Sequence, residues 1–109
     1  MARTEFPTDK EGFLRDTRDW SESVAHELAR AGSIELDPPR LKLLVAARDY
    51  YDQYGQAPLA RSFVRHCQQQ DPAVSSMTLM QYFPPSSQAG SSIKQICRIA
   101  GLPKPPGCL

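Results

Sequence analysis

The chain has 109 residues, of which 40% are hydrophobic and 23% are charged, and its formal net charge is +1 at pH 7. This length suits one domain with a modest core. The small net charge argues against a protein whose overall field attracts nucleic acid or a membrane surface. From Gly55 onward, however, the basic residues accompany a single acidic one, Asp71, so the C-terminal half is mildly positive and favours thiolates and anionic sulfur species.

The start of the chain, MARTEFPTDKEGF, lacks the apolar region of a signal peptide, and no run of about 18 apolar residues follows it. We therefore expect a cytoplasmic protein. The sequence contains 3 cysteines. An odd number in a reducing compartment argues against a disulfide framework and leaves reactive or buried thiols.

The N-terminal half predicts two helices after a loosely ordered, charged start that holds at most a short extended piece around EGFL. The segment DWSESVAHELARAG predicts a helix of about three turns, with Asp19 or Ser21 as its N-cap and Gly32 as its end. Asp37, followed by two prolines, starts the strongest predicted helix, which we take as the central one and which Gly55 ends. The apolar stripe of this helix consists of Leu41, Leu44, Val45, Tyr51 and Tyr54.

The C-terminal half predicts three shorter helices. The second of them, SSMTLMQYF, is capped by Ser75 or Ser76, and the third, SSIKQICRIAG, ends at Gly101 after the low-complexity loop PPSSQAGSS. The first, within APLARSFVRHCQQQ, has an apolar face of Leu59, Phe63, Val64 and Cys67. The apolar side of the last predicted helix consists of Ile93, Ile96, Cys97 and Ala100.

These elements predict a mainly α fold, a small orthogonal bundle of about five helices with at most a minor β element near the N-terminus. We expect a helical domain over residues 1–101 and a mobile C-terminal arm over residues 102–109. We place this boundary at Gly101 because the arm, LPKPPGCL, offers almost no side chains that could be buried.

The arm combines prolines with a penultimate cysteine. Pro103, Pro105 and Pro106 favour the polyproline II conformation, which could project the thiol of Cys108 roughly 20 Å from the bundle. Gly101, Pro103, Lys104, Pro105 and Gly107 are the residues that we expect to position the arm. The alternative interpretation is a disordered terminus in which the place of the cysteine is accidental.

Cys97 lies 11 residues before Cys108. A disulfide requires Cα atoms within about 7 Å, which a folded-back arm can reach, so extended and retracted states both follow. A helix C-terminus and a terminal carboxylate both disfavour a thiolate, so we expect Lys94, Arg98, Lys104 or a partner to activate these thiols.

Other candidate sites receive less support. Cys67 continues an apolar helix face and is interpreted as a core residue. The absence of Cys-x-x-Cys and the adjacency of His66 and Cys67 argue against zinc, and His26 has no evident nucleophile beside it. We predict no metal and no stably bound cofactor. Trp20 is expected to seal the start of its helix, the tyrosines to pack, and three arginines to form a solvated face: Arg48, Arg61 and Arg65.

The segment from Pro58 to Tyr82 could instead form a helix-turn-helix, with the two arm cysteines as a redox switch. Its presumed recognition segment, SSMTLMQYF, contains no Lys, Arg or Asn to contact bases or phosphates. Nucleic acid is therefore not an expected partner, and plain helix packing is the favoured interpretation of this segment.

The ending KQICRIAGLPKPPGCL resembles the C-terminal arm of the DsrC/TusE family of sulfur-relay proteins. Two upstream segments, DKEGFLRDTRDWSESVAHELA and RDYYDQYGQAPLARSFV, resemble the family's opening and middle motifs. The resemblance covers most of the chain. The sequence differs from the family pattern at QQQDPAVSS, at the longer approach SSQAGSS, and in a shorter N-terminal hairpin.

The resemblance implies a helical fold in which Cys108 carries persulfide sulfur. Family members with the penultimate cysteine alone resemble relay proteins for tRNA thiolation. Members that also have the cysteine corresponding to Cys97 resemble the partner of siroheme-containing dissimilatory sulfite reductase, and both cysteines can hold a bridging sulfur. The resemblance therefore implies a carrier of covalent persulfide or trisulfide sulfur whose partners are proteins of a sulfur-relay or sulfite-reductase system, with Cys97 resolving the sulfur on Cys108.

Overall fold

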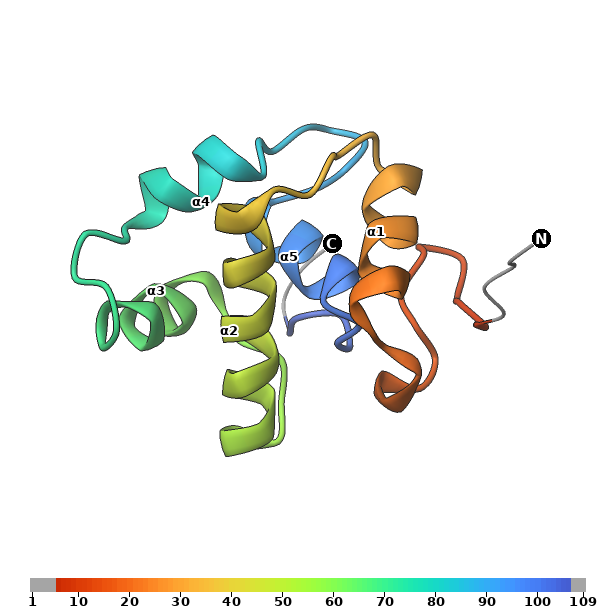
Figure 1. The fold of residues 1–109 in the computed structure, drawn as a ribbon, viewed down its shortest axis with the longest axis horizontal. Coiled ribbons are helices and arrows are strands. Elements are labelled where there is room, and N and C mark those ends of the chain that lie inside the picture. Colours follow the sequence, from red (N-terminus) through yellow and green to blue (C-terminus); the bar gives the residue numbers. More distant parts are fainter. Residues whose placement is uncertain (1–5, 107–109) are drawn as a thin grey trace.

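The computed structural model describes residues 6–106 and contains five α-helices and one short 3-10 helix in this range (Figure 1). The described residues form no β-strand. Near the N-terminus, where a minor β element was predicted, they form one isolated antiparallel bridge between Thr8 and Leu14. The mainly α prediction with five helices is confirmed. The elements are η1 (Thr17–Asp19), α1 (Glu22–Ala31), α2 (Pro38–Tyr54), α3 (Ala60–Gln68), α4 (Ser76–Tyr82) and α5 (Ser92–Ile99).

The helix ends follow the local signals in the sequence. The side chain of Ser21 accepts a hydrogen bond from the Val24 amide at the start of α1, and Asp37 does the same for the Arg40 amide in α2. At the end of α2, Gly55 adopts a left-handed conformation with φ of 74°. Short polar side chains and glycine thus set these helix boundaries, as predicted.

The most buried helix is α5. It packs against α1, α2 and α4, and in Figure 1 it lies between α1 and α2. The predicted apolar stripe of α2 was wrong in part, because Val45 and Tyr54 are each 54% exposed. The buried residues of α2 are Leu43, Leu44 and Ala47.

The face of α3 that packs on α2 is narrower than predicted. Phe63 is fully buried and Cys67 is 6% exposed, whereas Leu59, just before the helix, is 50% exposed. Burial raises the pKa of the Cys67 thiol to about 11. The low exposure of Cys67 confirms the prediction that it packs in the core. The raised pKa keeps its thiol protonated at neutral pH.

The chain immediately after α5 is packed against the domain. Leu102 is 0% exposed, Pro105 is also fully buried, and the amide of Leu102 donates to the Cys97 carbonyl over 2.9 Å. We call residues 102–106 the arm root. The prediction that the arm has almost nothing to bury was wrong for Leu102 and Pro105, whereas Pro103 and Pro106 are exposed as expected.

Within residues 6–106, no helix combines the length and apolarity needed to cross a lipid bilayer.

Candidate functional site at the end of α5

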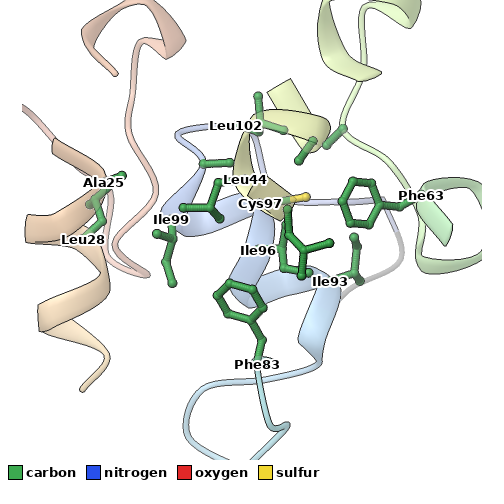
Figure 2. Packing of buried hydrophobic residues seen from close by; sticks show 14 of the residues in the cluster. Ala25, Leu28, Leu44, Phe63, Phe83, Ile93, Ile96, Cys97, Ile99 and Leu102 are labelled. Atoms are coloured by element: carbon green, nitrogen blue, oxygen red, sulfur yellow. The ribbon is translucent and has the colours of Figure 1, made fainter. Parts of the chain in front are cut away.

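Cys97 lies in the last turn of α5 with its side chain 0% exposed. Figure 2 shows its sulfur directed to the side of the core where Phe63 of α3 lies. Reaction at this thiol therefore requires a local opening of the packing. Gly107 and Cys108 lie outside the described residues, so the pairing of Cys97 with Cys108 stays a prediction.

Two side chains bind the carbonyl groups that end α5. The indole Nε1 of Trp20 donates to the Ile99 carbonyl over 2.9 Å, and Nη1 of Arg48 donates to the Ala100 carbonyl over 2.8 Å. The Arg48 guanidinium also donates from Nη2 to Thr17 over 3.1 Å and lies 4.6 Å from the Trp20 ring centroid. We call these two side chains the Trp20–Arg48 clamp.

The clamp corrects the prediction for Arg48 and gives Trp20 a further role. Arg48 does not belong to a solvated face, because partial burial lowers the pKa of its guanidinium and both of its acceptors are backbone carbonyls. Trp20 reaches beyond the start of α1 to the opposite end of the chain. A cation and an indole donor at a helix C-terminus satisfy carbonyl groups that the helix itself leaves unpaired.

Gly101 supplies the turn that connects α5 to the arm root. Its φ is 73°, and a Cβ at this position would lie 2.6 Å from a ring carbon of Trp20 and 2.9 Å from Leu14 Cδ1. The predicted turn thus requires glycine for two reasons, the left-handed backbone and the close approach of the clamp.

An ion bridge joins the arm root to α5. The carboxylate of Glu11 accepts from the Lys94 ammonium over 3.0 Å through Oε1 and from the Lys104 ammonium over 3.1 Å through Oε2. Lys94, and then Lys104, lower the pKa of the Glu11 carboxyl. The sequence analysis singled out Lys94 as support for a thiolate and Lys104 as a residue that positions the arm. It did not predict that a carboxylate would bind both lysines.

Arg98 was predicted to support a thiolate electrostatically. In the structure its Nη1 donates to the Leu28 carbonyl over 3.0 Å, and its guanidinium passes so close to Gly32 that a Cβ there would lie 2.5 Å from Nη2. Burial lowers the pKa of this group. Arg98 therefore links α5 to α1, and any effect on a thiol stays a prediction.

A hydrogen-bonded pair of polar side chains, which the sequence did not indicate, joins α2 and α3. Nε2 of His66 lies 2.9 Å from Oδ2 of Asp49, and the Tyr50 ring packs edge-on against the imidazole at 5.4 Å. His66 is 9% exposed. Nowhere in residues 6–106 do three His, Cys, Asp or Glu side chains converge as a metal site requires.

Comparison with known proteins decides the family. A sequence model of the family described as "DsrC like protein" matches residues 1–109. The chain belongs to this family. This agrees with the resemblance of its motifs to sulfur-relay proteins of the DsrC/TusE type.

Named relatives and solved structures come from both branches. The chain is 36% identical to the sulfurtransferase TusE of Sodalis glossinidius over 108 residues, covering 97% of this chain and 95% of that protein. It is 37% identical to the oxidized gamma-subunit of dissimilatory sulfite reductase, DsrC, from Archaeoglobus fulgidus, with a TM-score of 0.75 and coverage of 95% and 92%. The NMR structure of Allochromatium vinosum DsrC gives a TM-score of 0.80 at 34% identity, with coverage of 95% and 90%.

Proposed function

We propose that this protein carries sulfur on Cys108 as a persulfide and that Cys97 resolves it. The observation that carries the proposal is the combination of a family match over residues 1–109 with two cysteines, Cys97 in the last turn of α5 and Cys108 in the arm that follows it. The position of Cys97 supports it, because the arm root is hydrogen-bonded to the peptide group of Cys97 itself.

The release step balances without an external oxidant. The thiolate of Cys97 attacks the inner sulfur of the Cys108 persulfide, the Cys97–Cys108 disulfide forms, and the outer sulfur leaves as hydrosulfide, which takes up the proton of the attacking thiol. In a transfer step, a partner thiol attacks the outer sulfur instead. A bridging trisulfide requires the removal of two electrons and two protons, so a partner would have to supply a two-electron acceptor.

Burial of Cys97 separates loading from release. A thiol with no exposed surface is protected from donors in solution, so sulfur is loaded first on Cys108. Release then requires a local opening at the end of α5, where the arm root also begins. A partner that binds at the end of α5 would control this opening.

We propose a dissimilatory sulfite reductase as the partner, because Cys97 is present and because the similar protein of Archaeoglobus fulgidus is named a subunit of that enzyme. The second candidate is a relay of the TusE type, favoured by relatives named sulfurtransferase TusE at 36% identity and below. The cytoplasmic location stays a prediction.

Intact-mass measurement after incubation with inorganic polysulfide tests the carrier function. The wild-type chain and Cys97→Ser should gain increments of about 32 Da, and Cys108→Ser should not. The Cys97→Ser variant should keep its persulfide, because release as hydrosulfide needs the second thiol. Equal loading of Cys108→Ser and wild type would contradict the proposal.

Affinity capture with each candidate partner separates the two branches. The purified reductase and the purified thiolation relay proteins of the same organism are each immobilised and offered the persulfidated chain. Retention on the reductase, lost in Cys108→Ser, is the expected result. Retention on the relay proteins alone would assign the protein to the TusE branch.

A further inference from the structure

Glu11 lies where three segments meet. It belongs to a tight N-terminal turn in which Gly12 donates to the Asp9 carbonyl and the Asp9 carboxylate accepts from the amide of Glu11. From this turn its two carboxylate oxygens bind Lys94 of α5 at 3.0 Å and Lys104 of the arm root at 3.1 Å. One side chain thus connects the N-terminal turn, α5 and the arm root.

Each of the two lysines precedes one of the two cysteines by a few residues. Lys94 precedes Cys97 by 3 residues, which places it one helical turn earlier on a neighbouring face of α5. Lys104 precedes Cys108 by 4 residues. At no more than about 3.6 Å per residue, the Cα atom of Cys108 therefore stays within roughly 14 Å of that of Lys104.

From this geometry we infer that Glu11 is a positioning residue for the internal sulfur-release step. The inference rests on the proposed function. By holding Lys104 beside Lys94, Glu11 restrains the arm root and raises the effective concentration of the Cys108 persulfide at Cys97. Glu11 itself touches neither sulfur and takes no part in the bond changes.

Removal of the carboxylate acts in two ways. The attraction between the arm root and α5 is lost, and two ammonium groups that shared one anion are left near each other and repel. The buried side chains of Leu102 and Pro105 still hold the arm root to the core. The effect on the release step is therefore a moderate slowing.

The test follows the release of hydrosulfide after the full-length chain has been loaded with inorganic polysulfide and freed of excess reagent. Glu11→Gln should slow release about two- to fivefold, the range that an exposed ion pair can supply. Loading of Cys108 should be unchanged, because it is bimolecular. A matched control is Glu27→Gln, which removes an exposed carboxylate that pairs with Arg30 at 3.6 Å far from the arm root in sequence; its release rate should equal that of wild type.

A double-mutant cycle distinguishes positioning from a general structural role. If Glu11 acts through Lys104, the combined variant of Glu11→Gln and Lys104→Gln should release sulfide about as fast as Glu11→Gln alone. Glu11→Asp should restore part of the rate, since it keeps the charge with a shorter reach. In 0.5 M KCl the wild type should slow toward the rate of Glu11→Gln, while that variant should change little.

The outcomes separate the two proposals. Equal release by wild type and Glu11→Gln, or additive effects in the double-mutant cycle, would overturn the positioning role. If the loaded wild type released no sulfide and formed no disulfide, the proposed release step itself would fail, whatever the variants did.

Discussion

Two anchors hold the chain beyond α5, and they differ in kind. The Trp20–Arg48 clamp binds backbone carbonyls in a partly buried setting, whereas the Glu11 bridge binds two ammonium groups close to solvent. Neutral and charge-assisted hydrogen bonds to buried carbonyls respond little to salt, while an exposed ion bridge weakens with salt and at low pH. The clamp therefore fixes the end of α5, and the bridge is the anchor that conditions and partners can adjust.

The largest effect should come from Gly101→Ala, because the added Cβ would meet the Trp20 ring at 2.6 Å in a backbone with φ of 73°. We expect a loss of roughly 2–4 kcal/mol in the free energy of unfolding, from left-handed strain plus overpacking. Urea denaturation measures it. Gly55→Ala is the matched control, with φ of 74° and nothing within 4 Å of the added Cβ.

The control should lose only about 1–2 kcal/mol, which is the conformational cost of the left-handed backbone. The difference between the two variants isolates the close packing of Trp20 and Leu14 against Gly101. Equal losses would show that the clamp does not press on Gly101.

A smaller loss should follow Arg48→Ala. Two carbonyl groups lose a charged donor and the Trp20 ring loses its stacking partner, so we expect about 1–3 kcal/mol. Arg61→Ala, on the exposed side of α3, should stay within about 0.5 kcal/mol of wild type. Denaturation midpoints at 0.1 and 0.5 M KCl should give the same loss for Arg48→Ala, and a loss that vanished in salt would place Arg48 with the exposed ionic anchor.

The smallest effect concerns the pH dependence of the Glu11 bridge. Its two lysines lower the pKa of the Glu11 carboxyl below the ordinary value of 4.5. A carboxyl with a lowered pKa in the folded state contributes stability that is fully present above the ordinary value and is lost as the pH falls through the lowered one.

The melting temperature of wild type should therefore exceed that of Glu11→Gln at neutral pH by a small margin that closes below pH 4.5. Thermal denaturation followed by circular dichroism at a series of pH values checks this. A margin that persisted at low pH would contradict the ionic origin of the bridge.

The sequence was most informative where structure depends on neighbouring residues. Ser21, Asp37, Gly55 and Gly101 mark helix boundaries because capping and left-handed turns are decided within a few residues. The amphipathic stripe of α5 also followed from spacing alone. In α2, by contrast, Val45 is exposed because which face of a helix meets the core depends on where its neighbours pack.

The sequence identified some of the residues around the candidate site but not the contacts that they make. The motifs that contain Glu11 and Trp20 were recognised by their resemblance to a family, but nothing local in them indicates a partner 93 or 79 residues away. For the same reason Arg48 was predicted to lie on the surface. Nothing in the residues around an arginine indicates that its guanidinium will bind a carbonyl 52 residues away.

The sequence by itself thus determined the helices, their ends, the 11-residue spacing of Cys97 and Cys108, and the resemblance to the family. The tertiary structure alone decided that Cys97 is shielded in the core, that Leu102 and Pro105 are buried, and that a carboxylate joins Lys94 to Lys104. The physical reason is that caps and periodicity are short-range properties of a chain. Burial and ion pairing depend on which distant segments come together when it folds.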